Sequence, residues 1–176
     1  MMKGFIILLL ALVCTPFYPV FSSVTVKDSL PDIRNKEYVY SVKKIQGAIK
    51  IDGVTDEPDW LAAQKAPVSH LVLPVDTGKP ILPSDILLTY DDKAFYMAII
   101  FYDTIPGKRI AESFRRDWVF SNNDNFLSFF DTFLDQTNGF SFGVNAAGAV
   151  WDGMMYDGAN MNLDWDTKWE SKTRQY

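Results

Sequence analysis

The chain of 176 residues carries 17 Lys and Arg against 22 Asp and Glu, for a net charge of −5, and 15% of its residues are aromatic. An acidic balance argues against nucleic acid and anionic lipid as partners, so uncharged ligands suit the chain better. It has a single Cys and a single His, His70. A transition-metal site or a His-based catalytic triad is therefore without support.

The first 23 residues are typical of a secretory leader. Lys3 precedes an apolar run of 11 residues from Gly4 to Cys14, Pro16 and Pro19 interrupt the run, and the small residue Ser23 follows. Eleven apolar residues are too few to cross a bilayer core, which needs about 20. The sequence thus predicts a cleaved leader, residues 1–23, and export to the periplasm, the outer membrane or the outside of the cell.

Cleavage of this leader would change the composition of the protein. Cys14 would leave with it, so the mature chain would have no disulfide and would depend on apolar burial. Lys3 would leave as well, which gives 16 basic against 22 acidic residues and a net charge of −6. A lipid anchor on Cys14 is the weaker alternative, because Val13 is bulkier than the residue expected before a lipidated cysteine.

Residues 24–41 are polar and are expected to form a linker or arm, whereas residues 42–176 have the pattern of one domain. A short helix is expected over Asp56–Ala63, which opens with acidic residues and Pro58. Short runs rich in β-branched and aromatic residues predict strands at Ala48–Ile51, Val68–Val72, Asp85–Tyr90, Ala94–Asp103, Phe126–Phe133, Gly139–Asn145, Ala149–Tyr156 and Trp165–Thr173. About eight short strands and one short helix predict an all-β fold, an antiparallel β-sandwich of jelly-roll or immunoglobulin-like type.

Six short motifs lie in order between Ile45 and Arg174. They are Ile51-Asp52-Gly53 with Asp56–Trp60, Leu87–Tyr102, Asn123–Phe126 with Asp131–Phe133, Asn138–Asn145 with Gly148, Asp164–Asp166, and Trp169–Ser171. In this order they resemble the family 9 carbohydrate-binding modules, in the form that opens a larger family of bacterial exported proteins.

The resemblance implies a sugar-binding β-sandwich from bacteria that degrade polysaccharides. In the larger family this domain precedes a strand-rich region similar to an outer-membrane barrel, and related modules are attached to glycoside hydrolases. The resemblance also implies a fragment, with the sandwich incomplete at its C-terminus, because members continue into a further strand or two. One departure is Phe126-Leu127-Ser128, where members often carry an acidic residue.

Sugar recognition usually stacks a pyranose face on Trp or Tyr while charged or amide groups bond the hydroxyls. The candidate carbohydrate-binding residues are Trp118, Trp151, Trp165, Tyr156, Arg116 and Asp124. Trp118 is the strongest candidate because it follows Arg115-Arg116-Asp117. In a disulfide-free sandwich a Trp is more often part of the core, so a core role is the alternative for each ring. Trp60 and Trp169 are assigned to the core, and Asn123-Asp124 has turn capping as its alternative.

No cofactor is required by the sequence. The oxygen-rich group Asp152, Asp157, Asn160, Asn162, Asp164 and Asp166 could bind Ca²⁺, but its spacing matches no EF-hand loop and a solvated loop is favoured.

No carboxylate pair lies in a recognisable catalytic motif, so no catalytic residue is assigned. The leading hypothesis is non-catalytic binding of a polysaccharide or oligosaccharide, in association with carbohydrate breakdown. The alternatives are a structural periplasmic domain beside a C-terminal barrel or hydrolase domain and, least favoured, a fragment of a hydrolase acting on O-glycosyl bonds.

Overall fold

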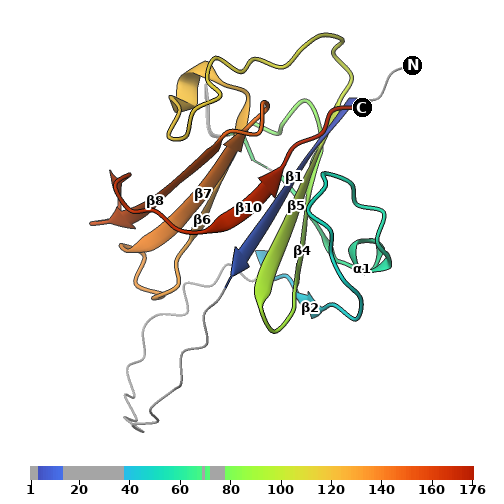
Figure 1. The fold of residues 1–176 in the computed structure, drawn as a ribbon, viewed down its shortest axis with the longest axis horizontal. Coiled ribbons are helices and arrows are strands. Elements are labelled where there is room, and N and C mark those ends of the chain that lie inside the picture. Colours follow the sequence, from blue (N-terminus) through green and yellow to red (C-terminus); the bar gives the residue numbers. More distant parts are fainter. Residues whose placement is uncertain (1–3, 14–37, 69, 72–77) are drawn as a thin grey trace, which may run out of the picture.

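The computed structural model describes residues 4–13, 38–68, 70–71 and 78–176, with the backbone alone for 4–13. The described residues form two β-sheets, one short α-helix and one 3-10 turn (Figure 1). The all-β fold predicted from the sequence is confirmed. No helix in these residues has the length and apolarity that a membrane span requires.

The first sheet has six strands in the order β10–β1–β5–β4–β2, and β3 pairs with β4 outside this path. All pairs are antiparallel except β2 with β4. The bounds are Gly4–Val13 for β1, Lys43–Lys44 for β2, Lys65–Pro67 for β3, Ser84–Tyr90 for β4, Ala94–Asp103 for β5 and Trp169–Lys172 for β10.

The second sheet has four antiparallel strands in the order β6–β7–β8–β9. The bounds are Asn125–Phe130 for β6, Gly139–Asn145 for β7, Val150–Tyr156 for β8 and Asn160–Asn162 for β9. The tight turn between β7 and β8 uses Gly148, whose φ of +85° lies in the left-handed region that favours glycine.

Three apolar clusters hold these elements. Between the sheets, Met97 and Ile99 of β5 contact Phe142 and Val144 of β7. On the opposite face of the first sheet, Trp60 forms a cluster with Leu87 of β4 and with Ala98 and Ile100 of β5. A third cluster of Trp118, Ala149 and Trp151 lies at β8 of the second sheet. The side chains of alternate residues of β5 thus pack into two different apolar clusters, because successive side chains of a strand point to opposite faces of the sheet.

The helix α1, Pro58–Leu61, is shorter than predicted and brings Trp60 into the core. The predicted strand Ala48–Ile51 is absent. The segment and the two residues before it are held instead by the start of α1. Asp59 of α1 accepts hydrogen bonds from the backbone N–H groups of Gln46 and Gly47, and Glu57, the N-cap residue, accepts one from Lys50. Side-chain acceptors here replace the strand partner.

The predicted strand Val68–Val72 is also wrong within its described residues. There Leu71 makes only an isolated bridge to Gly78, and the preceding strand β3 ends at Pro67. Because Pro67 has no backbone N–H, it suits the end of a strand pairing. Residues 69 and 72 lie outside the described residues.

The N-terminal strand β1 lies between β5 and β10 (Figure 1). It pairs with β5 along all 10 of its residues, from Gly4 opposite Asp103 to Val13 opposite Ala94. This strand is most of the apolar run predicted to be the core of a leader. In the full chain it belongs to the sheet, and its removal on export stays a prediction. Residues 14–37, with the predicted cleavage point and most of the linker, lie outside the described residues.

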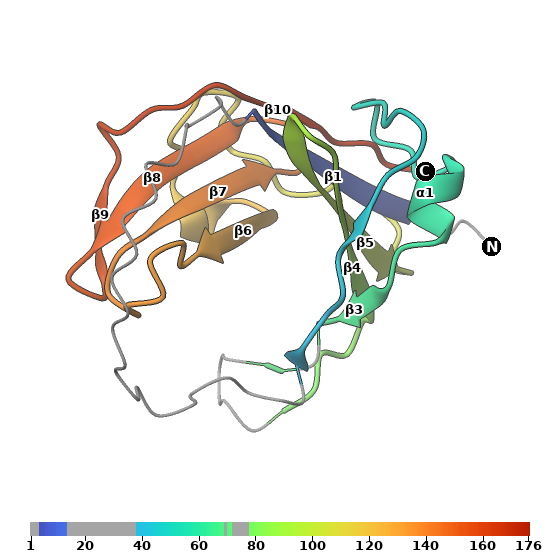
Figure 2. The same ribbon diagram turned by 90° about the horizontal axis from the view of Figure 1, so that it is seen from below.

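The chain crosses from the second sheet to the first between β9 and β10, as Figure 2 shows. Along this crossing Trp165 and Trp169 pack against Phe142 of β7, with ring centroids 6.1 and 5.5 Å away. The crossing therefore lies on the inner face of the second sheet. Because β10 then pairs with β1, the two sheets are linked through these indole rings.

Candidate functional site

A cavity of about 210 Å³ lies where strand ends of the two sheets meet. Ser84 begins β4 and is paired with Phe101 near the end of β5, while Asn125 begins β6 and is paired with Asn145 at the end of β7. The antiparallel register thus collects four strand ends at one place. The cavity is lined by Leu82, Ser84, Phe101, Asp103, Arg109, Asp124, Asn125, Phe126, Val144, Asn145 and Ala146.

The apolar wall of the cavity contains two aromatic rings. Phe101 comes from the first sheet and Phe126 from the second, with ring centroids 6.5 Å apart and planes inclined by 64°. This edge-on arrangement is a favourable one for aromatic pairs. It joins the sheets while both rings still contribute surface to the cavity.

The charged part of the cavity is an ion pair between Arg109 and Asp103. Nη1 of Arg109 contacts Oδ2 of Asp103, and both side chains are mostly buried. Nη2 of Arg109 donates to the carbonyl of Ile105 at 2.8 Å, and Oδ1 of Asp103 accepts from the N–H of Ile105 at 2.7 Å. Opposite charges and two further bonds hold the guanidinium in one orientation, with its remaining N–H groups as fixed donors.

The side chains of Asn145 and Asn123 hold the long loop 104–124 in place through hydrogen bonds. Asn145 is almost wholly buried. Its amide oxygen accepts from the N–H groups of Ala147 and Ala149, and its amide nitrogen donates to the carbonyl of Ser113 at 2.6 Å and to Oδ1 of Asn123 at 3.2 Å. These bonds fix the loop, and so they also set the position of Arg109.

Asp124 lies at the junction of loop, strand and turn. Its Oδ2 accepts from the N–H of Ile110 at 2.8 Å, its own N–H donates to the Ile110 carbonyl at 2.7 Å, and its carbonyl accepts from Ala146 at 2.8 Å. Within the described part of the chain, no hydrogen bond engages Oδ1 of Asp124. The carboxylate thus has a structural tie through one oxygen and an acceptor left for a ligand through the other.

A shallow depression continues from the cavity along β6. It shares Asp124, Asn125 and Phe126 with the cavity and adds Phe120 and Phe129. These two added rings are 58% and 55% exposed. An aromatic surface beside amide and carboxylate groups is therefore present at the edge of the second sheet.

The structure places the predicted Trp residues elsewhere. Trp118 and Trp151 are only 4% and 9% exposed, and Nε1 of Trp118 donates to the carbonyl of Ala149 at 2.9 Å. Buried in this way, neither ring presents a face to solvent. Burial was the alternative that the sequence left open for each of them.

The other predicted aromatics are partly exposed but do not line the cavity. Trp165 lies against Phe140, with centroids 4.9 Å apart, and belongs to the inter-sheet cluster. Tyr156 is at the end of β8 with 40% of its surface exposed. Of the six predicted site residues, only Asp124 is in the cavity.

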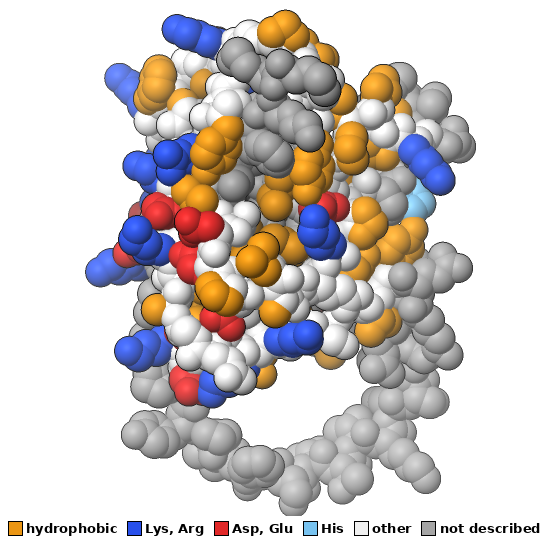
Figure 3. Space-filling model, turned by 90° about the vertical axis from the view of Figure 1, so that its right-hand side faces the viewer, with side chains coloured by type: hydrophobic (Ala, Val, Ile, Leu, Met, Phe, Trp, Pro, Cys, Tyr) orange, Lys and Arg blue, Asp and Glu red, His pale blue; other side chains and the backbone are white. Residues whose placement is uncertain are grey.

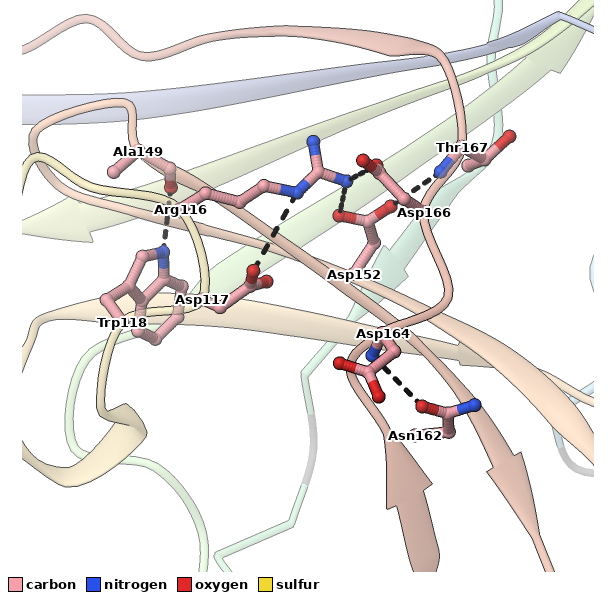
Figure 4. A network of polar contacts seen from close by, with 9 residues as sticks. All are labelled: Arg116, Asp117, Trp118, Ala149, Asp152, Asn162, Asp164, Asp166 and Thr167. Atoms are coloured by element: carbon pink, nitrogen blue, oxygen red, sulfur yellow. Dashed lines mark hydrogen bonds and ion pairs between the residues drawn. The ribbon is translucent and has the colours of Figure 1, made fainter.

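Arg116 joins a separate polar network, shown in Figure 4. Its Nη2 contacts both Asp152, which is wholly buried, and Asp166, while Oδ2 of Asp152 accepts from the N–H of Thr167 at 3.1 Å. Burial raises the pKa of Asp152, against the lowering effect of the Thr167 N–H and of Arg116. The network ties the long loop, β8 and the crossing to β10, so Arg116 acts here as a structural bridge.

Sequence reasoning missed Asp103, Arg109 and the four Phe residues at 101, 120, 126 and 129 as site residues. Asp103 was taken as the end of an apolar strand, and Arg109 lies in the same polar loop from which Arg116 was chosen. A signal did exist: a carboxylate ending a strand with a lone Arg six positions later suits an ion pair that closes the loop. Phe126 was noted only for its place in the family motif Asn123–Phe126 and in the departure that follows it.

The described residues contain no group of three or more His, Cys, Asp or Glu side chains that could hold a metal ion. In the acidic group considered for Ca²⁺, Asp152 and Asp166 are bridged by Arg116. Asn162 accepts from the N–H of Asp164 at 3.0 Å, as Figure 4 also shows. These oxygens already have partners within the protein.

The surface carries charges of both signs. Figure 3 shows the side on which α1 lies in Figure 1, and there acidic and basic side chains are interspersed with apolar ones. The first sheet and its turns also carry ion pairs, such as Lys44 with Asp92 and Lys65 with Asp85. Such a mixture does not favour a polyanionic partner.

Comparisons with known proteins give no relative. No protein-family model matches the chain, and neither a curated protein nor a solved structure is significantly similar to it.

Proposed function

We propose that this chain is a non-catalytic carbohydrate-binding domain with its site in the cavity between the strand ends. The observation that carries the proposal is the lining, in which Phe101 and Phe126 face the same space as Arg109 and Asp124. Apolar walls with a few convergent polar groups are the usual form of a small-ligand site, and sugars need both parts.

The size of the cavity limits the ligand. At about 210 Å³ it is smaller than the roughly 300–1,000 Å³ of sites for drug-sized molecules. It suits a single sugar unit or the end of a glycan chain. The exposed rings of Phe120 and Phe129 then offer a surface on which a second unit would stack.

The finer fold assignment belongs to the same proposal. Two sheets that share the cluster of Met97, Ile99, Phe142 and Val144 support an antiparallel β-sandwich of the kind implied by the family 9 resemblance. That resemblance, with the predicted leader, supports an exported protein that takes part in polysaccharide breakdown by binding substrate.

Catalysis is not proposed because each carboxylate in the cavity is tied to a neighbouring group through at least one oxygen. A glycoside hydrolase needs one carboxyl group that delivers a proton. Both oxygens of Asp103 are engaged by Arg109 and the N–H of Ile105, and Asp124 is tied to Ile110.

Calorimetry of the full chain against a panel of neutral oligosaccharides tests the proposal, with Arg109→Gln as the site variant and Arg115→Gln as its control. Arg115 is exposed in the same loop but does not line the cavity. Loss of charge-assisted bonds to hydroxyls should weaken binding by about tenfold or more in Arg109→Gln alone. Absence of heat with every sugar, or equal affinity of both variants, would contradict the proposal.

A structural or partner-contact role is the second candidate, favoured by large apolar side chains on the surface. Phe133 and Leu134 follow β6, Phe114 lies in the long loop, and all three are strongly exposed. Exposed apolar groups of this size can mark protein contacts. Under this alternative, Phe133→Ser with Leu134→Ser would abolish association measured by sedimentation, and the chain would bind no glycan.

A further inference from the structure

The position of β1 in the first sheet differs from that of any other strand. Its ten residues pair with all ten residues of β5, and its other edge pairs with β10 from Leu9 opposite Lys172 to Leu12 opposite Trp169. Among the described residues, β10 has no other strand partner. Removal of β1 would therefore leave β10 unpaired and open the whole edge of β5.

The same ten residues are the apolar segment that a leader peptidase would remove with the predicted leader. The sequence GFIILLLALV contains no Pro and no charge, so it serves equally as the core of a leader and as a sheet strand. The segment cannot be both removed with the leader and retained in the sheet. A processed chain would hold β5 without its neighbour on that side.

An open edge of β5 would be an unusually strong template for another strand. Residues 97–100 of β5 are buried, on alternate faces, in the two apolar cores on either side of the sheet. Exposed backbone N–H and C=O groups beside a flat apolar strand invite pairing with another chain. Strand addition to such an edge is a common mode of peptide recognition.

We propose that the position between β5 and β10 is a strand-binding site, which Gly4–Val13 fills in the full chain and which leader removal makes available. Its ligand is an extended apolar segment of about ten residues that runs antiparallel to β5. The occupant present in the structure defines this chemistry. The site adjoins the cavity, because Phe101 and Asp103 line the cavity and also pair with Ile6 and Gly4 of β1. It takes a peptide strand and not a sugar, so it goes beyond the proposed sugar binding.

The test vacates the site within the full chain. In a Cys14→Ser background, Ile7→Pro with Leu9→Pro removes backbone donors from the middle of β1. The probe is a synthetic peptide of residues 4–13 with flanking lysines for solubility. The vacated chain should bind the probe with a stoichiometry of one to one. A chain with an unaltered β1 should not bind it. A probe that carries the same two prolines is the matched control and should not bind.

Register is tested with cysteines. Val13 lies opposite Ala94, so in a glutathione redox buffer, whose oxidised form accepts the two electrons, a probe with Val13→Cys should form a disulfide with Ala94→Cys in the vacated chain. A probe with Gly4→Cys would place its thiol about 30 Å away and should react at least tenfold more slowly. Equal reaction from both ends, or no uptake by a folded vacated chain, overturns the proposal.

Two further results complete the test. If the vacated chain does not fold, addition of the probe should restore the circular dichroism of the full chain, and failure to do so counts against the site. In the Cys14→Ser chain with β1 otherwise unaltered, Val13→Cys with Ala94→Cys should form an intramolecular disulfide in the same redox buffer. Its absence would show that Gly4–Val13 does not occupy this position.

Discussion

The guanidinium of Arg116 reaches the carboxylate of Asp152, a side chain with no solvent exposure, and bridges it to Asp166. Removal of the cation should leave a buried carboxylate without its charged partner. We expect Arg116→Met to lower the free energy of unfolding by about 1.5–3 kcal/mol, at the lower end if water replaces the partly exposed guanidinium. Urea denaturation measures this, with exposed Arg115→Met as the control that should change little. Equal loss in both variants would show that the bridge contributes nothing.

The pH dependence of stability should report on Asp152. Because burial raises its pKa, the folded protein binds a proton at this site at a higher pH than the unfolded chain, whose Asp residues titrate near pH 3.9. As the pH falls from neutral to about 4, wild type should therefore gain stability relative to Asp152→Asn. Denaturation curves of both proteins over this range give the difference. A relative loss for wild type would mean that Arg116 outweighs burial and lowers the pKa.

The buried amide of Asn145 should control the long loop. Asn145→Ala removes acceptor and donor groups that hold Ser113, Asn123 and the turn at Ala147–Ala149. We expect a loss of about 2–4 kcal/mol in the free energy of unfolding, since several buried polar groups lose their partners together. Limited proteolysis should also cut within 104–124 faster. Asn160→Ala, on the exposed edge strand β9, is the control, and a similar change there would remove the special role of Asn145.

Position 143 should accept only glycine, because the side chain of Leu127 lies where a Cβ would be. A Cβ at this position would overlap Cδ2 of Leu127 and lie 3.2 Å from the carbonyl oxygen of Phe126. We expect Gly143→Ala to cost about 1–3 kcal/mol through overpacking. Combined with Leu127→Ala, the substitution should cost less than the sum of the two single changes, because the overlap is gone. Strict additivity in thermal denaturation would refute this contact.

The exposed rings beside the cavity should contribute to sugar affinity. Phe129→Ala removes one wall of the depression along β6, and an aromatic contact is worth about 0.5–1.5 kcal/mol, or roughly two- to tenfold in affinity. Phe133→Ala truncates a ring of similar exposure that does not line this surface. Calorimetry with the best-bound oligosaccharide should show the loss for Phe129 alone, and a loss of equal size for Phe133→Ala would contradict this placement.

Strand positions could be predicted because local patterns decide them. The predictions at Ala94–Asp103 and Gly139–Asn145 match β5 and β7 residue for residue. The first run is rich in β-branched and aromatic residues, and the second alternates apolar with small or polar residues. The strand predicted at Ala48–Ile51 failed because the backbone of Lys50 bonds the carboxylate of Glu57, the N-cap residue of α1, in place of a neighbouring strand.

The candidate site was less predictable for a related reason. Trp118 was selected because charged residues precede it, yet those residues face other partners while the indole turns inward. Arg109 and Asp103 line the cavity only because the strand register brings the ends of β4, β5, β6 and β7 together. Such contacts between distant segments cannot be inferred from the local spacing of residues in the sequence.

We propose that a sugar occupies the cavity bounded by Phe101, Arg109, Asp124 and Phe126. The most direct measurement is a titration of isotope-labelled full chain with the tightest-binding oligosaccharide, followed by the shifts of assigned backbone amides. We predict saturable shifts at these four residues and at Asn125, with little change at Tyr156 and Trp165. Shifts confined to Tyr156 and Trp165, or no saturable shift with any sugar, would contradict the account.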